Sequence, residues 1–313
     1  MAIEAFIAIV GFIIGLTVLV YSSDKAIKHS IKIATTLGIS PFIVGLVLVS
    51  IGTDLPEIAN SILSSAAGHG DINVGDSLGS ALTQITLVLG LITLLSKKFK
   101  VKRKEVIVTG ICLILALILA VSIVKKGYIS RFNAFTLIAS WPVFMLFTKW
   151  LTAKEVKKKF MYEYKWSFRQ DVITAILGFV CVALGSYVLI QSVIKLSTIF
   201  TVSEYLVSFF MVAIGTSLPE LIVDLTAIRK EEYELAIGDI VGSCIVDATV
   251  SLGIGNLFFP SYISGNLAMI TGLYAIFASM IVITTLAWKK TLTRKIGMYF
   301  ILVYLFSYTM LSI

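Results

Sequence analysis

The chain contains ten apolar stretches, each long enough to cross a lipid bilayer as a helix, which requires about 20 mostly apolar residues. Only 14% of its 313 residues are charged and the mean hydropathy is +0.98, whereas a soluble domain would carry about 25% charged residues. This excludes a water-soluble enzyme, a nucleic-acid-binding module and a disordered chain. It predicts an all-α integral membrane protein with ten transmembrane helices. The expected segments are 2–21, 41–65, 72–96, 105–124, 131–150, 171–195, 203–228, 234–259, 263–288 and 296–312.

Basic residues cluster in alternate connectors between these segments. The net charge is +8, and 22 of the 26 Lys and Arg residues lie in the connectors after the first, third, fifth, seventh and ninth segments. Cytoplasmic loops are enriched in Lys and Arg, so this pattern reflects topology and not a nucleic-acid partner. We expect a multi-pass protein of the plasma membrane with both termini extracellular. The longest connector, 151–170, is then a basic cytoplasmic linker.

The chain also repeats itself. When it is shifted by 163 residues, segment 42–90 aligns with 205–253 without a gap, and 15 of the 49 positions are identical. The linker separates two halves of five helices, 1–150 and 171–313, which have opposite topology because five is odd. Inverted repeats are a recurring construction of secondary transporters, with the substrate bound near the midplane between them.

Glu57 and Glu220 occupy equivalent positions in the middle of two apolar segments. A carboxylate at the bilayer centre costs roughly 2.5–3.5 kcal/mol on insertion scales. A structural ion pair would explain such an acid, but no Lys or Arg lies near the centre of any segment. The sequence therefore favours a bound cation as the partner of the two carboxylates.

A proline precedes each of these glutamates. Pro56 and Pro219 have no N–H and cannot bond back to the carbonyls of Gly52 and Gly215, so each helix should kink or break there. Irregular backbone at membrane depth is tolerated where it lines a cavity, and free carbonyl oxygens are good ligands for hard cations.

Helical spacing gathers oxygen-bearing side chains around the glutamates. Residues three or four positions apart share one face of a helix. No His or Cys is in register with them, so the donor set suits Ca²⁺, Na⁺ or Mg²⁺ and argues against zinc or copper. The pairs are Thr53 and Asp54 with Glu57, Thr216 and Ser217 with Glu220, Ser80 with Gln84, and Ser243 with Asp247.

A second repeated block, Gly-Asp-x-x-Gly-Ser, follows in each half at 75–80 and 238–243. Asp fills N-cap positions well, so Asp76 and Asp239 are expected to open their helices. Gly79 and Gly242 should allow close approach of neighbouring helices.

Three further polar residues lie outside the predicted central site. Asp224 lies one turn beyond Glu220 and is expected to line an access path or to bind a water molecule. His29 and His69 are expected to lie in solvated connectors.

The repeated blocks Gly52-Thr53-Asp54-Leu55-Pro56-Glu57 and Gly215-Thr216-Ser217-Leu218-Pro219-Glu220 resemble the two alpha-repeats of the sodium/calcium exchanger family, within the cation/calcium antiporter superfamily. The resemblance covers essentially the whole chain and implies a prokaryotic ten-helix exchanger that binds one Ca²⁺ or several Na⁺ in alternation. It implies four central ligands, flanking hydroxyl ligands and two backbone carbonyl ligands. By this resemblance the central ligands are Glu57, Gln84, Glu220 and Asp247, the flanking ones are Thr53, Ser80, Thr216, Ser217 and Ser243, and the carbonyls are those of Ser50 and Ala213.

The sequence departs from the family pattern at two positions. Asp54 stands where the motif usually has Ser, and Gln84 stands where Asn or Asp is usual. Gln reaches one methylene further, and Asp54 could supply the oxygen that Gln84 cannot. Up to four acids would then share one site, and they cannot all ionise cheaply without cations. This makes proton coupling an alternative to sodium coupling.

The resulting expectation is an antiporter that exchanges Ca²⁺ for Na⁺ by alternating access at one mid-membrane site. We expect the first and sixth segments to form the moving gate, with no cofactor, no enzymatic reaction and no obligatory protein partner. The alternatives are a proton-coupled Ca²⁺ (or other divalent cation) antiporter, a channel, and an intramembrane aspartyl protease built on Asp76 and Asp239.

Overall fold

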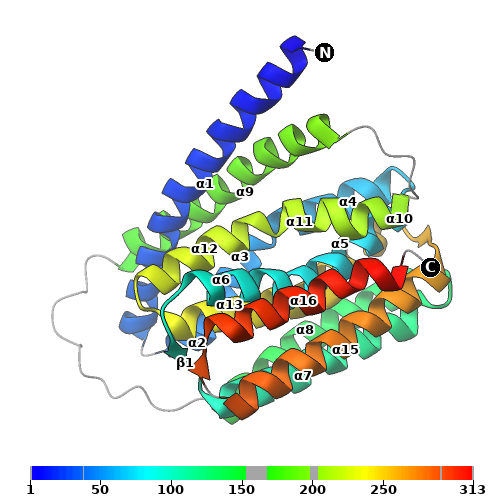
Figure 1. Cartoon of the computed structure of the whole chain (residues 1–313). Coiled ribbons are helices and arrows are strands. Elements are labelled where there is room, and N and C mark those ends of the chain that lie inside the picture. Colours follow the sequence, from blue (N-terminus) through cyan, green and yellow to red (C-terminus); the bar gives the residue numbers. More distant parts are fainter. Residues whose placement is uncertain (1, 38, 153–167, 198–203, 290, 312–313) are drawn as a thin grey trace.

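The computed structural model describes residues 2–37, 39–152, 168–197, 204–289 and 291–311. They form an almost entirely helical molecule whose helices run roughly along one direction (Figure 1). Most of the predicted linker 151–170 lies outside the described residues.

Two elongated helices form a separate layer of the molecule. α1 (Ala2–Leu37) and α9 (Phe168–Ser197) lie side by side and tilt away from the other helices (Figure 1). A glycine allows the two helices to pack closely at one point, because a Cβ at Gly178 would lie 3.0 Å from the backbone nitrogen of Ala26. Both helices contact α12, α1 also contacts α2 and η1, and α9 also packs against α3, α4 and α11.

The repeated segments fold into two matching series of short helices. Each series is α-helix, π-helical turn, α-helix, a break, then two further helical stretches of which the second again contains a π-helical turn. The first is α2 (Pro41–Val44), η1 (Gly45–Val49), α3 (Ser50–Thr53), α4 (Leu55–Ala66), α5 (Gly70–Thr83), η2 (Gln84–Val88) and α6 (Leu89–Leu95). The second is α10 (Glu204–Val207), η3 (Ser208–Val212), α11 (Ala213–Thr216), α12 (Leu218–Arg229), α13 (Tyr233–Val246), η4 (Asp247–Ser251) and α14 (Leu252–Phe258).

The predicted proline breaks are confirmed. The chain bends by 43° between η1–α3 and α4, and by 40° between η3–α11 and α12. The helix is interrupted at Asp54 in the first repeat and at Ser217 in the second. Pro56 and Pro219 then lie in the first turn of the helix that follows. A proline is tolerated there because the first turn has no intrahelical acceptor for its missing N–H.

Each series packs its second long helix against the broken span of the other. α5 contacts α10, η3 and α11, while α13 contacts α2, η1 and α3. The predicted role of Gly79 and Gly242 in close packing is confirmed, because a Cβ on either would collide with a carbonyl oxygen, that of Phe209 or of Leu46. The two series are therefore interleaved at the centre of the molecule.

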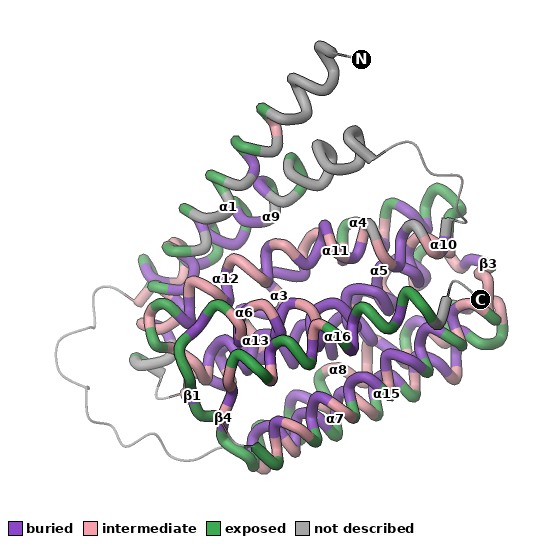
Figure 2. The backbone as a smooth tube through the Cα atoms, viewed as in Figure 1, coloured by how far each residue is buried: buried purple, intermediate pink, exposed green. Residues whose placement is uncertain are grey.

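Four helices complete the bundle. They are α7 (Arg103–Val124), α8 (Arg131–Thr152), α15 (Gly265–Lys289) and α16 (Arg294–Leu311). Figure 2 shows that burial concentrates on the central helices: the most apolar stretch of α13–α14 is 94% buried, against 22% for α8. The surface of the outer helices is apolar, as lipid contact requires, and includes exposed Leu146, Leu302 and Phe306.

Five helices of the described residues are long and apolar enough to cross a membrane, and the number is seven if each bent pair is one span. These seven coincide with seven of the ten predicted segments. The other three predicted segments fall on α1, α9 and α16, which are helical but are not among these candidates. The count of ten spans therefore stays a prediction.

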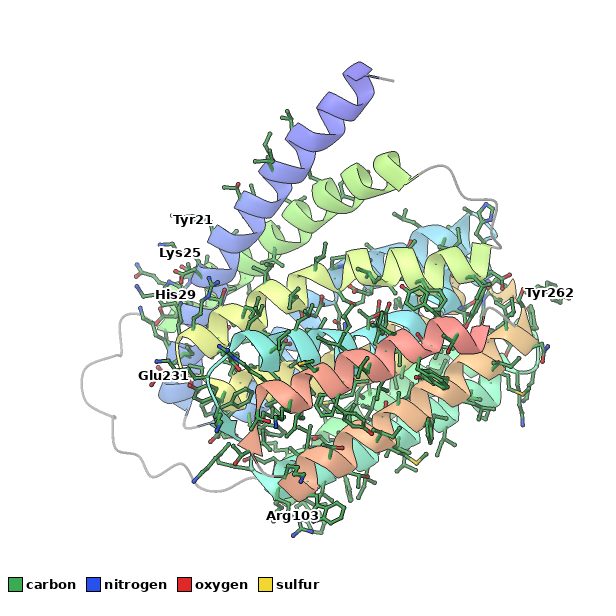
Figure 3. All side chains as sticks on the ribbon, viewed as in Figure 1. Tyr21, Lys25, His29, Arg103, Glu231 and Tyr262 are labelled. Carbon is green, nitrogen blue, oxygen red and sulfur yellow. The ribbon has the colours of Figure 1, made fainter. Side chains whose placement is uncertain are left out.

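Two short antiparallel strand pairs tie connectors together at the ends of the bundle. β1 (Phe99–Lys100) pairs with β4 (Thr291–Leu292) and β2 (Tyr128–Ile129) with β3 (Ser261–Tyr262). In Figure 3, Lys25, Arg103 and Glu231 lie towards one end of the molecule and Tyr262 at the other.

Two sequence predictions about helix ends were wrong. Asp76 and Asp239 do not open their helices, because α5 begins at Gly70 and α13 at Tyr233, so both aspartates lie about two turns inside. His29 is not in a solvated connector, because α1 continues to Leu37. Its Nδ1 lies 2.6 Å from the carboxylate of Asp171 on α9.

Candidate ion-binding site

Three carboxyl groups meet where the two broken spans face each other. Asp54 occupies the break before α4, Glu57 lies in the first turn of α4, and Glu220 lies in the first turn of α12. One oxygen from each lies within 4.8 Å of the others, and all three side chains are at least 99% buried. The breaks create this geometry, since each turns the start of a helix towards the molecular centre.

None of these carboxyl oxygens accepts a hydrogen bond from the described residues. The ion pairs of the described chain involve other acids, namely Asp24, Glu105, Asp171 and Glu234. Burying a charge without a partner is strongly unfavourable. Positive helix N-termini, which α4 and α12 present at Glu57 and Glu220, compensate only a fraction of a charge. The cluster could therefore hold a cation that the protein does not itself supply.

Asp247 and Gln84 complete the predicted central set. They occupy equivalent positions at the start of η4 and η2, are fully buried, and have side-chain oxygens without a hydrogen-bond donor among the described residues. Asp247 interacts electrostatically with Asp54, Glu57 and Glu220. The structure thus brings the four predicted central residues and Asp54 into one buried region.

The predicted hydroxyl ligands join the two repeats in crossed pairs. Thr53 Oγ1 lies 3.4 Å from Ser243 Oγ, and Ser80 Oγ lies 3.1 Å from Thr216 Oγ1. Each pair links the broken span of one repeat with the long helix of the other. The fifth hydroxyl, on Ser217, is buried and has no partner in the described residues.

The two predicted carbonyl ligands already take part in helix bonding. Ser50 O accepts from Asp54 N at 3.0 Å and from Thr53 Oγ1 at 3.2 Å. Ala213 O accepts from Ser217 N at 3.1 Å and from Thr216 Oγ1 at 3.3 Å. Their role as ligands stays a prediction, and an ion there would share the oxygen with these donors.

Asp76 is a buried acid that the sequence analysis placed at a helix end. It accepts hydrogen bonds from Asn60 Nδ2 at 2.5 Å, Thr216 Oγ1 at 3.0 Å and Ser80 Oγ at 3.4 Å. It therefore fixes two of the predicted hydroxyl ligands. The signal that could have revealed this is its position four residues inside an apolar segment.

Asp224 and Asp239 are buried more deeply than the sequence analysis expected. Both side chains are 0% exposed and neither has a hydrogen-bond donor in the described chain. Asp224 follows Glu220 by one helical turn, and that i,i+4 spacing was the available signal.

The fold and this site define a class of protein. It is a polytopic membrane protein with a buried cluster of carboxyl groups where two repeated, broken helices meet. The chain belongs to the family described as "Sodium/calcium exchanger protein", whose match covers residues 7–150 and 171–313. Each matched segment contains one of the two broken helices together with its glutamate, Glu57 or Glu220.

Relatives that are named as antiporters or exchangers agree with this assignment. The chain is 30% identical over 269 residues to "Putative antiporter CaxA" of Alkalimonas amylolytica, which covers 84% of each chain. It is 26% identical over 287 residues to "Sodium/calcium exchanger MaX1" of Methanosarcina acetivorans, covering 79% of this chain and 82% of the relative. Among solved structures, the sodium-calcium exchanger NCX_Mj superimposes with a TM-score of 0.79 at 25% identity, over 97% of this chain and 98% of that one.

Proposed function

We propose that this protein is a secondary-active antiporter that exchanges Ca²⁺ for Na⁺ across the membrane. The observation that carries the proposal is the buried carboxyl cluster of Asp54, Glu57 and Glu220, whose oxygens have no protein donor. Its relatives are named sodium/calcium exchangers and antiporters, and the protein is accordingly a transporter and not a protease.

The proposed mechanism is competition of the two ions for one site by alternating access. Ca²⁺ takes six to eight oxygen ligands and engages Glu57 and Glu220 together with Asp247 and Gln84. Na⁺ ions spread over the remaining acids and the flanking hydroxyls. An ion-filled site hides its charge, so the two faces of the molecule can slide past each other only when ions are bound.

The α1–α9 layer is the proposed moving gate. Neither helix contributes a carboxylate to the cluster, and a Cβ at Gly52 would collide with the Phe179 ring of α9, which places α9 directly beside the broken span. A translation of this layer would therefore uncover the site without dismantling the central helices.

The proposed topology is two inverted five-helix repeats, 1–150 and 171–313, with ten spans in the plasma membrane and both termini extracellular. The matched element order around the two breaks supports the repeats. α1 runs towards the end with Lys25, Arg103 and Glu231, and α16 runs away from it (Figures 1 and 3). The basic residues in the connectors at that end favour a cytoplasmic location for it.

Proton-coupled Ca²⁺ transport is the second candidate, and Asp54 is the observation that favours it. A third carboxylate within 4.8 Å of Glu57 and Glu220 adds negative charge that a proton could balance. A proton gradient would then replace the sodium gradient as the driving force.

Uptake of ⁴⁵Ca²⁺ into proteoliposomes separates these functions. Vesicles are loaded with Na⁺ at clamped pH, and Glu220→Gln is measured in parallel. Uptake that requires the outward Na⁺ gradient and disappears in the variant supports sodium exchange at this site. Uptake driven only by a pH gradient supports the proton-coupled alternative, and no uptake under either gradient refutes Ca²⁺ transport.

A further inference from the structure

Asp224 and Asp239 form a second pair of buried acids next to the central cluster. Asp224 lies on α12 and Asp239 on the neighbouring α13, both side chains are 0% exposed, and the two interact electrostatically with each other. None of their four oxygens accepts a hydrogen bond from the described residues. The two residues are not among the ligands that family resemblance implies.

The other repeat provides an internal comparison for this pair. The equivalent of Asp239 is Asp76, which three donors satisfy, the shortest being the Asn60 amide at 2.5 Å. At the same offset of 163 residues, Asn60 is replaced by Val223 and Ser61 by Asp224. The second repeat has thus lost the amide donor and gained a carboxylate. One buried aspartate is hydrogen-bonded by three protein donors, and the other has a second carboxylate beside it.

Two facing carboxylates without donors require positive charge from outside the protein. We propose that Asp224 and Asp239 bind a second hard cation, of the oxygen-ligated class that includes Ca²⁺ and Na⁺. Hydroxyl groups are available as further ligands, because Thr53 and Ser243 are polar neighbours of Asp239. All the donors are oxygen atoms, which excludes a soft metal.

The position of this pair gives the second cation a role in transport. On α12, Asp224 lies between Glu220 and the helix end at Arg229; on α13, Asp239 lies between Ser243 and the helix start at Tyr233. The pair therefore lies on the Arg229–Tyr233 side of the central cluster. This role rests on the proposed function: an ion passing between the central cluster and that end of the molecule would pause at Asp224 and Asp239.

Counting bound ions on the purified full-length protein tests the proposal. Equilibrium dialysis with ⁴⁵Ca²⁺ and, separately, with ²²Na⁺ gives the number of each ion per chain. Asp224→Ser introduces the residue that the first repeat has at this position, and Asp239→Asn removes the second carboxylate with little change of shape. Asp71→Asn is the matched control, because it makes the same chemical change at a carboxylate outside the proposed ion sites that already has the backbone N–H and hydroxyl of Ser264 as donors.

The expected result is the loss of one ion per chain in both Asp224→Ser and Asp239→Asn, for whichever of the two ions occupies the pair. Asp71→Asn should keep the wild-type count. Binding of the remaining ions shows that each variant is folded. An unchanged count of both ions in Asp224→Ser and Asp239→Asn overturns the second site, and the exchange proposal then stands on its own uptake measurement. A wild-type protein that binds neither ion overturns both proposals.

Discussion

Replacing Asp54 with Asn should stabilise the ion-free protein. Asp54 is the extra acid of the cluster, since the equivalent residue of the other repeat is Ser217. Its carboxyl group lies within 4.8 Å of those of Glu57 and Glu220 and accepts no hydrogen bond from the described chain. The substitution removes a charge and keeps the shape of the side chain, so it isolates the electrostatic contribution.

The magnitude follows from two competing costs. Two unit charges at the upper limit of 4.8 Å repel by about 3.5 kcal/mol at an effective dielectric constant of 20. Two such pairs involve Asp54, so full ionisation would cost about 7 kcal/mol. Protonating one carboxyl group of ordinary acidity at pH 7 costs only about 4 kcal/mol. Protonation is the cheaper of the two, so the ion-free wild type would take up a proton. The stability gained by Asp54→Asn is therefore at most about 4 kcal/mol.

The assay is the apparent melting temperature of the detergent-purified protein without Ca²⁺ and Na⁺. At roughly 2–4 °C per kcal/mol for chains somewhat shorter than this one, the variant should melt several degrees higher. The gain should shrink by about 1.4 kcal/mol per pH unit below 7, because protonation becomes easier. Saturating Ca²⁺ should reduce the difference, since a bound ion stabilises the wild type by about 2.7 kcal/mol at 100 times its dissociation constant.

The control is Asp71→Asn, whose carboxylate lies outside the cluster and already has the backbone N–H and hydroxyl of Ser264 as donors, so this variant should not melt at a higher temperature than the wild type. If Asp54→Asn melts at or below the wild-type temperature in the absence of ions, the three carboxyl groups do not repel one another and the electrostatic reasoning is wrong.

Three other substitutions test the packing and the gate. Gly242→Ala places a Cβ 2.5 Å from a carbonyl oxygen of η1 and should lower stability by about 1–3 kcal/mol, measured as a drop in melting temperature. Asp71→Ala removes the 2.6 Å hydrogen bond that ties the start of α5 to the Ser264 hydroxyl and should cost about 1–3 kcal/mol in the same assay. Lys230→Met breaks the exposed 2.8 Å ion pair with Asp24 of α1, so it should change stability by less than about 1 kcal/mol but raise the rate of Ca²⁺ uptake, because the pair links the proposed gate to the central helices.

The sequence predicted the features of the site that carry a strong local signal. A proline beside a glutamate within an apolar segment, repeated at a fixed offset, predicted both breaks at Asp54 and Ser217. Paired glycines predicted the close approach of α13 to η1, as at Gly242. These signals are informative because a charged residue or a proline inside a membrane-spanning segment is costly, so its presence there has few possible reasons.

The sequence was less informative where the environment of a residue depends on helix length or on contacts with distant parts of the chain. Asp76 was expected to cap a helix because Gly-Asp is a common helix start, but α5 begins six residues earlier, at Gly70. His29 was expected in solvent because the apolar stretch ends near residue 21, yet the helix continues on polar residues and pairs His29 with Asp171. Such contacts join residues more than a hundred positions apart, which no local pattern reports.

The two repeats of this protein share a backbone plan but differ in where they place acids. In the first repeat Asp54 adds a carboxyl group to the central cluster, while Asp76 accepts a hydrogen bond from the Asn60 amide. In the second repeat the equivalent residue is Ser217, which adds no carboxyl group to the cluster. The extra acid of that repeat is Asp224, which lies outside the central cluster and has no hydrogen-bond partner in the described chain. A perfectly symmetric transporter would offer ions the same energy from either side. A ligand shifts a conformational equilibrium only through its different affinities for the two states. If the proposed alternating access holds, we therefore expect this asymmetry to give the inward- and outward-facing states different affinities for ions and to bias the resting conformation.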